Sequence, residues 1–263
     1  MSGGAYFISD VHLGVANFNN KLQENVLIKF LEEEILNNAE NLFIVGDLFD
    51  CWIEYRQVIQ KGFYRVFSRL YDIVNNGIKV TYIAGNHDFW RSKYFKDEFG
   101  IEILDKAFIW EKDNKKFYIH HGDGLAYKDT GYKILKVILR SPISQMLYSL
   151  IHPDIGVWLA KKSSNTSRIH TSKKDYSIRD GLKDFAKQKI SEGYDYVIMG
   201  HRHKPAIVKF GNGYYINLGD WMGIFSYGKF KDGTFKLLKF FDMESNTFLA
   251  EDRREVYKIV RKE

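Results

Sequence analysis

The chain has 263 residues, of which 45% are hydrophobic and 27% charged, as in an ordinary globular protein. This length supports one large domain, or one domain with an insertion. The formal net charge of +6 suggests an anionic partner such as nucleic acid, a phosphorylated substrate or an acidic membrane face. No apolar run reaches the roughly eighteen residues of a transmembrane helix. The single cysteine, Cys51, excludes an internal disulfide, and the start of the chain lacks the features of a signal peptide.

The first part of the chain alternates between two kinds of pattern. Apolar runs at 5–9, 42–45 and 78–84 are typical of buried strands. Between them, apolar residues at helical spacing predict amphipathic helices over 22–36 and 63–74. Strands separated by helices indicate an α/β fold with crossover helices.

The later part predicts a hairpin and more strands. Residues 107–122 resemble a hairpin that turns at Asn114. A buried strand is expected at 194–200, and further short strands at 206–241. We therefore expect a core formed by 1–128 and 193–263.

The segment 129–192 is expected to be a helical insertion. It contains two of the three prolines, and it has an apolar stripe at helical spacing: Ile143, Met146, Leu147, Leu150 and Ile151. One interpretation is a helical insertion packed on the core. The other is a cap, or lid, that covers an apolar ligand and touches a membrane surface.

Polar residues with metal-binding chemistry follow the predicted strands. These are Asp10, His12, Asp47, Asp50, Asn86, His87, Asp88, His121, Asp123, His201, His203 and Asp220. Ligands of α/β sheets bind beyond the carboxyl ends of the strands, so these groups are expected to converge there.

Alternation along an extended backbone suggests which of them face the same way. Residues i and i+2 share a side, so Asp10 with His12, and His201 with His203, would each reach one site. Neighbouring His120 and His121 would point to opposite sides, so only one is expected to be a ligand. His121 is favoured because it lies next to the Gly-Asp turn. Glycines 46, 85, 122 and 200 permit sharp turns and close backbone approach.

This mixture of imidazole and carboxylate groups suits manganese, iron, zinc or cobalt. The expected ligands are Asp10, His12, Asp47, Asn86, His121, His201 and His203. They exceed the needs of one tetrahedral ion, whereas two ions that share Asp47 account for all of them. A pair of metals can activate a water and hold both oxygens of a phosphoryl displacement. Each motif by itself has an ordinary structural explanation, but five together favour metal binding. Asp88, Asp123 and Asp220 are expected to hydrogen-bond the ligands or to cap turns.

The ordered set D-x-H, G-D, G-N-H-D, H-G-D and G-H-x-H resembles the calcineurin-like metallophosphoesterases. The resemblance implies a four-layer αββα sandwich with a dinuclear site. One metal would bind Asp10, His12, Asp47 and His203, and the other Asp47, Asn86, His121 and His201. His87 would contact the phosphate and protonate the leaving group, so that His87, Asp47 and Asn86 carry the catalysis.

A narrower resemblance extends from Tyr6 to about Trp221. The segments "GDLFDCWIEY", "GNHDFW", "HHGDGLAYKDTGYK" and "GHRHKPAI" are similar to the UDP-2,3-diacylglucosamine pyrophosphatases of lipid A synthesis, the LpxH group. This implies hydrolysis of UDP-2,3-diacylglucosamine to UMP and 2,3-diacylglucosamine 1-phosphate, with two divalent ions, Mn²⁺ first and Fe, Zn or Co as alternatives. It also implies a lid that receives acyl chains and a cytoplasmic enzyme peripherally attached to the anionic face of the inner membrane. The implied substrate contacts are Asp129, Tyr132, Ser164, Asn165 and Arg168.

Two departures from the narrower group stand in the motifs. Many of its members have arginine where this chain has His87, and "WIEY" replaces a more acidic run. The alternatives are a phosphoesterase with another substrate, such as a nucleotide or phosphoprotein, and a non-catalytic scaffold. A nucleic-acid partner is not expected, because the insertion is apolar and no basic-aromatic stripe is evident.

Overall fold

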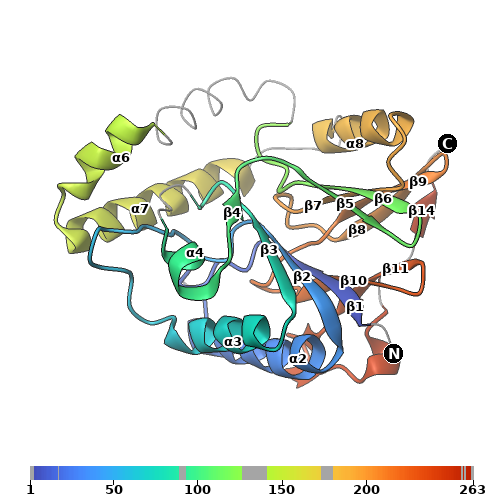
Figure 1. Ribbon diagram of the computed structural model, residues 1–263, viewed down its shortest axis with the longest axis horizontal. Coiled ribbons are helices and arrows are strands. Elements are labelled where there is room, and N and C mark those ends of the chain that lie inside the picture. Colours follow the sequence, from blue (N-terminus) through green and yellow to red (C-terminus); the bar gives the residue numbers. More distant parts are fainter. Residues whose placement is uncertain are drawn as a thin grey trace.

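The computed structural model describes residues 3–16, 18–88, 93–125, 141–172, 180–255, 257 and 259–261. Its centre is a pair of six-stranded mixed sheets (Figure 1). The first sheet has the order β11 (Thr234–Lys239), β10 (Ser226–Lys231), β1 (Gly4–Ile8), β2 (Ala39–Val45), β3 (Lys79–Ile83) and β4 (Ile103–Leu104). The second has the order β14 (Ile259–Arg261), β8 (Ala206–Phe210), β9 (Gly213–Asn217), β7 (Tyr196–Met199), β6 (Lys115–Ile119) and β5 (Phe108–Lys112).

Parallel strands at the centre of each sheet bring their carboxyl ends to one edge. In the first sheet β1, β2, β3 and β4 pair in parallel, while β10 pairs with β1 in the antiparallel sense. In the second sheet β6, β7 and β9 are parallel to one another. The α/β class predicted from the sequence is therefore confirmed.

Helices cover the outer face of the first sheet. These are α1 (Asn20–Phe30), its continuation through the π-helix η1 (Leu31–Ile35) into α2 (Leu36–Asn38), and α3 (Tyr64–Asn75). Both helices predicted there are confirmed. Asn19 caps α1 by accepting a hydrogen bond from the Leu22 backbone N–H at 3.1 Å. After α3 the chain turns at Gly77, which has a φ of 79°.

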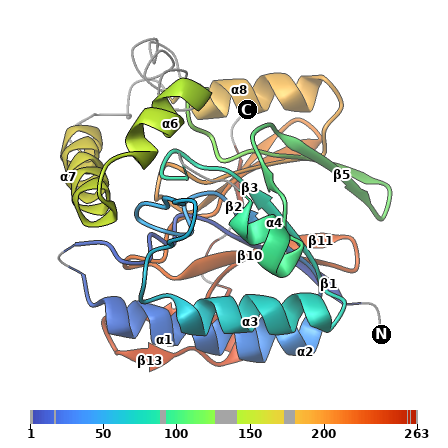
Figure 2. The same cartoon turned by 60° about the vertical axis from the view of Figure 1, so that its left-hand side comes forward.

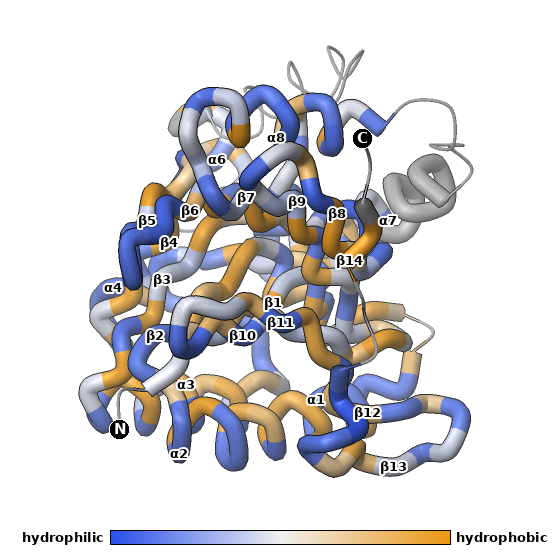
Figure 3. Tube along the Cα trace, turned by 90° about the vertical axis from the view of Figure 1, so that its right-hand side faces the viewer, coloured by the Kyte–Doolittle hydropathy of each residue, from blue (hydrophilic) through white to orange (hydrophobic). Residues whose placement is uncertain are grey.

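The alternation of β1 and β2 builds two separate cores. Tyr6 and Leu42 pack against the helices, whereas Phe7 and Phe43 face the second sheet. The Phe7 and Phe43 rings stack with centroids 4.7 Å apart. The layers run helix, sheet, sheet, helix in Figure 2, with α8 (Gly181–Ser191) on the far side. Figure 3 shows hydrophobic residues along the strands and hydrophilic residues at the outer turns.

The predicted hairpin is β5–β6. Its turn residues Asp113 and Asn114 have φ angles of 52° and 57°, the left-handed values of a tight hairpin turn. Smaller elements complete the described chain: α4 (Tyr94–Phe99), β12 (Phe241–Asp242), β13 (Thr247–Phe248) and the 3₁₀ turn η2 (Glu251–Arg253).

The described part of the segment predicted as an insertion contains three helices: α6 (Pro142–Ser149), α7 (Pro153–Ser172) and α8. Leu182 and Ala186 of α8 are buried against the second sheet, so α8 packs on the core. By contrast, α6 and α7 lie to one side of the sheets (Figures 1 and 2). Most of the predicted apolar stripe is exposed, with Leu147 of α6 at 56% and Leu150, directly after α6, at 78% of full exposure. Ile151 is half-buried. Among the described residues, no helix is long and apolar enough to cross a membrane.

Candidate metal centre

The predicted ligands gather at the edge where the parallel strands end. Asp10 and His12 follow β1, Asp47 follows β2, and Asn86 follows β3. From the second sheet, His121 follows β6, and His201 and His203 follow β7. Both sheets therefore supply side chains to the same place, as expected for this topology.

The backbone at these residues is not extended. Asp10, His12, Asp47, His201 and His203 have φ angles of 53°, 53°, 56°, 67° and 53°, in the left-handed region. Our expectation of alternation along an extended segment is therefore wrong, because β1 and β7 end before these residues. Such conformations are costly outside glycine and persist only where the surroundings hold them. Here the N–H of His12 donates to the Asp47 carbonyl at 2.9 Å, and the N–H of His201 to Asp10 Oδ2 at 2.9 Å.

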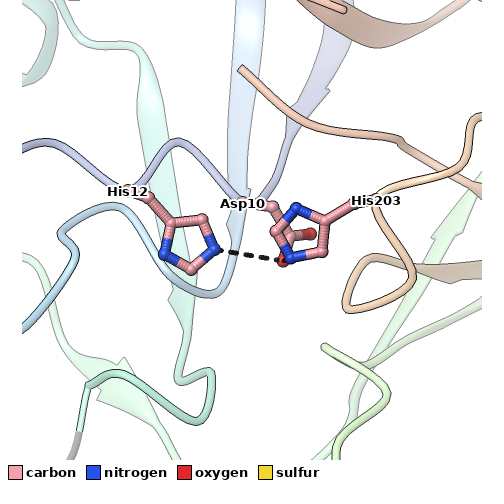
Figure 4. Close-up of side chains that lie close together, drawn as sticks. All are labelled: Asp10, His12 and His203. Carbon is pink, nitrogen blue, oxygen red and sulfur yellow. Dashed lines mark ion pairs between the residues drawn. The ribbon is translucent and has the colours of Figure 1, made fainter. Parts of the chain in front are cut away.

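One cluster surrounds Asp10. Its Oδ1 lies 3.7 Å from His12 Nε2 and 3.3 Å from His203 Nε2. Figure 4 shows the Asp10 carboxylate together with the His12 and His203 rings. The rings are nearly parallel, with an interplanar angle of 16° and centroids 5.1 Å apart. Burial alone would raise the pKa of Asp10, but the imidazoles of His203 and His121 hold it below its ordinary value.

A second cluster surrounds His121. Its Nδ1 lies 2.8 Å from the Val45 carbonyl, which can only accept, so Nδ1 carries hydrogen. Its Nε2 then faces two oxygens, Asp47 Oδ2 at 3.3 Å and Asn86 Oδ1 at 3.1 Å. The same Asn86 oxygen lies 2.9 Å from His201 Nδ1. A nitrogen lone pair directed at oxygens requires a proton or a cation between them.

These residues fit divalent metal ions. Asp10 Oδ1 and both ring nitrogens of His12 are buried and have no hydrogen-bond partner among the described residues. Possible ligand atoms lie within 4.8 Å of one another in three sets: Asp10, His12 and His203; Asp10, Asp47 and His121; His12, Asp47 and His87. Oxygen and imidazole donors without sulfur suit manganese, iron, cobalt or zinc.

The match with known proteins agrees with this geometry. A model of the calcineurin-like phosphoesterase family matches residues 5–205. The chain belongs to this family. Together with the buried histidine and aspartate clusters, membership identifies a metal-dependent hydrolase with a site for divalent metal ions.

Several curated relatives share one name, UDP-2,3-diacylglucosamine hydrolase. The relative from Porphyromonas gingivalis is 29% identical over 93% of this chain and 100% of its own length. That from Hamiltonella defensa is 33% identical over 76% of this chain and 77% of its own. The relative from Histophilus somni is 30% identical over 82% of this chain and 91% of its own length. The chain thus spans most of the length of each of these phosphoesterases.

The histidine of the phosphoesterase "GNHD" motif lies beside the clusters. His87 is buried, its N–H donates to Asp47 Oδ1 at 2.8 Å, and its Nδ1 lies 2.6 Å from the Asp50 carbonyl. Its ring meets that of His12 edge-on, with centroids 4.7 Å apart. The predicted roles of His87 and of the seven ligands stay predictions, since the structure gives their positions and not their functions.

The three predicted supporting carboxylates are buried near the clusters. Asp88 Oδ2 accepts hydrogen bonds from the N–H groups of Asp47 at 2.9 Å and Gly85 at 2.8 Å. Asp220 Oδ2 lies 3.7 Å from His203 Nδ1. The charge of Asp123 raises the pKa of His121. It also acts to raise the pKa of His201, against the stronger lowering by burial and by His121.

Only part of the predicted substrate-contacting set is described. Asp129 and Tyr132 lie outside the described residues, as do the side chains of Asn165 and Arg168, although α7 includes their backbone. The side chain of Ser164 is buried, and its hydroxyl donates to Asp50 Oδ1 at 2.9 Å.

Two residues near the site have a supporting position that the sequence patterns do not predict. Asp50 follows a predicted strand but has no predicted role, and Asn217, at the end of β9, belongs to none of the motifs. The Asn217 side-chain amide donates to the Gly200 carbonyl at 2.6 Å, next to His201. The signal that could have found Asn217 is its position, because a polar residue ending a buried strand faces the same edge as the ligands.

Proposed function

We propose that the protein hydrolyses the pyrophosphate bond of UDP-2,3-diacylglucosamine, giving UMP and 2,3-diacylglucosamine 1-phosphate in lipid A synthesis. The observation that carries this proposal is the set of relatives bearing that activity in their names, which align over most of both chains. The buried clusters supply groups suited to phosphoryl transfer.

The proposed metal ligands form two sets. Asp10, His12, Asp47 and His203 would hold one cation, and Asp47, Asn86, His121 and His201 the other. The proposed cation is Mn²⁺, with Fe, Zn or Co as alternatives. When bound, the cations would stabilise the charge that develops on the phosphoryl oxygens. Asp47 stands between the sets, with its Oδ2 3.8 Å from His12 Nε2 and 3.3 Å from His121 Nε2.

His87 is the proposed proton carrier. Its Nδ1 must hold hydrogen, because the Asp50 carbonyl only accepts. Nε2 is therefore the nitrogen at which a proton can be gained or given to the leaving group. Its burial excludes most water from that transfer.

The exposed apolar residues of α6 and α7 support a lipid-linked substrate. The exposed residues are Ile143, Met146 and Leu147 on α6, Leu150 directly after it, and Ile155, Trp158 and Leu159 on α7. Burial of acyl chains contributes about 0.8 kcal/mol of binding free energy per methylene group. We propose that these helices act as the lid and bring the enzyme to the anionic, cytoplasmic face of the inner membrane. Exposed Lys161 and Lys162 on α7 would favour that surface.

The deciding experiment measures UMP release from UDP-2,3-diacylglucosamine with and without Mn²⁺, beside hydrolysis of bis-p-nitrophenyl phosphate. We expect rapid, metal-dependent turnover of the lipid and slow turnover of the generic ester. Turnover of the generic ester alone would retain the metal-dependent chemistry and reject the lipid substrate. Turnover of neither, with metal bound, would favour a scaffold.

A further inference from the structure

Asp50 contacts two imidazoles and one helix that lies beside the sheets. It is 2% exposed and lies in the same loop as Asp47, after β2. Its Oδ1 accepts a hydrogen bond from Ser164 Oγ of α7 at 2.9 Å and lies 3.8 Å from His12 Nδ1. Its backbone carbonyl lies 2.6 Å from His87 Nδ1.

The donors and acceptors of this group form a consistent chain. His87 Nδ1 donates to the Asp50 carbonyl, and Ser164 donates its only hydroxyl hydrogen to the Asp50 carboxylate. The Ser164 oxygen, 3.3 Å from His87 Nδ1, can then accept a share of the same imidazole hydrogen. Two oxygens, one from Asp50 and one from Ser164, therefore hold the His87 ring at Nδ1.

His12 Nδ1 lies 3.8 Å from the same carboxylate, a charge contact too long for a hydrogen bond. The Nε2 of His12 faces Asp10 and Asp47, at 3.7 Å and 3.8 Å, so Nδ1 is the nitrogen that faces Asp50. A carboxylate that accepts from the far nitrogen of a metal-binding histidine fixes the ring, and its loss typically costs about 10- to 100-fold in metal affinity or activity. For the longer contact to His12 we expect an effect at the lower end of that range.

Helix α7 meets the loop after β2 at a second point. Gly156 lies about two turns before Ser164, on the same helix face. A methyl group at Gly156 would lie 1.9 Å from the Tyr55 hydroxyl oxygen. The Tyr148 hydroxyl donates to the Gly156 carbonyl at 2.6 Å. Because Gly156 has no side chain, α7 can approach the loop after β2 closely, and Ser164 then reaches Asp50.

We infer that Asp50 is a positioning residue, and that Ser164 links it to α7, so that the seating of α7 sets the orientation of His12 and His87. The inference rests on the proposed function for the catalytic use of His87. It differs from the predicted role of Ser164 as a substrate contact, because the hydroxyl acts here through Asp50.

The first test compares Ser164→Ala with Ser163→Ala, a matched change at the exposed neighbouring residue of the same helix. The substrate is bis-p-nitrophenyl phosphate with saturating Mn²⁺, since it lacks the uridine and acyl groups that α7 would contact in the lipid substrate. We expect Ser164→Ala to lower kcat about 3- to 10-fold with KM within two-fold, and Ser163→Ala to match the wild type. Equal kcat values for the two variants would overturn the inference. So would a Ser164→Ala defect confined to the lipid substrate, which would make the serine a substrate contact.

The second test does not depend on turnover. Calorimetry of Mn²⁺ binding to Asp50→Asn is expected to show an affinity at least 10-fold below wild type, and to Ser164→Ala a smaller decrease. Unchanged affinity in a folded Asp50→Asn variant would overturn the orienting role toward His12. If the wild type cleaves the generic ester but releases no UMP, the proposed lipid substrate is rejected. Both tests then still decide whether Asp50 and Ser164 position the histidines. If it cleaves neither, the calorimetric test decides alone.

Discussion

Asp47 joins the two clusters, and its position depends on the absence of a side chain at residue 85. Its carboxylate accepts the His87 N–H through Oδ1 and faces His121 through Oδ2. A methyl group at Gly85 would lie 2.0 Å from Asp47 Oδ1 and 2.8 Å from its backbone nitrogen. The second glycine motif behaves similarly, since a methyl group at Gly200 would lie 2.3 Å from Asp10 Oδ2. The close approach predicted from these glycines is therefore confirmed.

We predict that Gly85→Ala displaces Asp47 and lowers the affinity for Mn²⁺ by about 10-fold or more, a size comparable to the loss of other supporting contacts at metal sites. Isothermal titration calorimetry measures the change. Gly223→Ala is the matched control, because a methyl group there meets no atom within 4 Å. Equal affinities for the two variants would show that the site does not need the shared carboxylate in this position.

His121 makes metal binding dependent on pH. Burial alone would lower the pKa of His121, but Asp47 and Asp10 raise it to about 10. His201 competes little for protons, since burial and the charge of His121 lower its pKa to about 4. At neutral pH the metal-free protein therefore holds a proton on His121, and a cation must displace it.

The sign of the effect follows from this competition. Mn²⁺ affinity is predicted to rise with pH below about 10, by up to about ten-fold per pH unit. Calorimetry in buffers of different ionisation enthalpy should detect about one proton released as the site containing His121 is filled. His120→Gln should keep this behaviour, since Nδ1 of His120 accepts from the Gly122 N–H instead. A flat profile with no proton release would contradict the assignment of His121 as a ligand.

At the scale of elements, local patterns gave the helices and the hairpin correctly, and long-range pairing lay beyond them. The helix beginning at Asn20 and the turn at Asn114 are set by neighbouring residues, so the sequence predicts them. The pairing of β14 with β8 joins residues about fifty positions apart, such as Ile259 and Ile207, and depends on tertiary packing. The left-handed backbone at the ligands escaped prediction for the same reason, since the hydrogen bonds that hold it come from other strands.

Helix α6 has its apolar residues on the outside. Ser144, Gln145 and Tyr148 are half-buried, while Leu147 and Leu150 are exposed. The interpretation of this stripe as packed on the core therefore fails for α6 among the described residues. An exposed apolar face of this kind is typical of surfaces that bind protein, lipid or membrane.

We predict that the double variant Leu147→Glu, Leu150→Glu weakens binding to vesicles containing anionic phospholipid by about ten-fold or more, since burial of one leucine is worth about 1.5–3 kcal/mol. Co-sedimentation measures the partition coefficient. The melting temperature should change little, because both side chains are exposed. Tyr71→Glu, at an equally exposed position on α3, is the control. Failure of the wild type to sediment with vesicles, or an equal effect of the control, would contradict membrane contact through α6.

At the scale of the whole molecule, the site exists because two sheets close on one another. Asp10, His12, Asp47 and Asn86 come from the first sheet, and His121, His201 and His203 from the second, so neither sheet contains a complete set. The sequence predicted that these groups converge, because each follows an apolar strand. It did not reveal which sheet holds which strand, since side chains that meet between the sheets, such as Phe7 and Phe117, are far apart in the chain.

Far from the site, the C-terminal segment is tied to the first layer by a buried ion pair. Arg254 binds Glu34 of the π-helix, and both side chains are 10% exposed. The Tyr6 hydroxyl donates to Glu34 Oε2 at 3.2 Å, and Arg254 Nε donates to the Leu249 carbonyl at 2.8 Å. Loss of Arg254 would leave the buried Glu34 with Lys229, 3.8 Å away, as its one remaining ion-pair partner among the described residues.

We predict that Arg254→Met lowers the free energy of unfolding by about 3 kcal/mol. Breaking a buried ion pair typically costs about 3–5 kcal/mol. The lower end is expected here because Lys229 offsets part of the uncompensated charge of Glu34. Urea denaturation followed by circular dichroism measures the change. Arg253→Met, at the exposed preceding residue, should alter stability by less than about 0.5 kcal/mol. Adding Glu34→Gln to Arg254→Met should recover part of the loss, since the unpaired buried charge is then absent. Equal stabilities for the two single arginine variants would mean that the pair contributes nothing to holding the C-terminal segment on the sandwich.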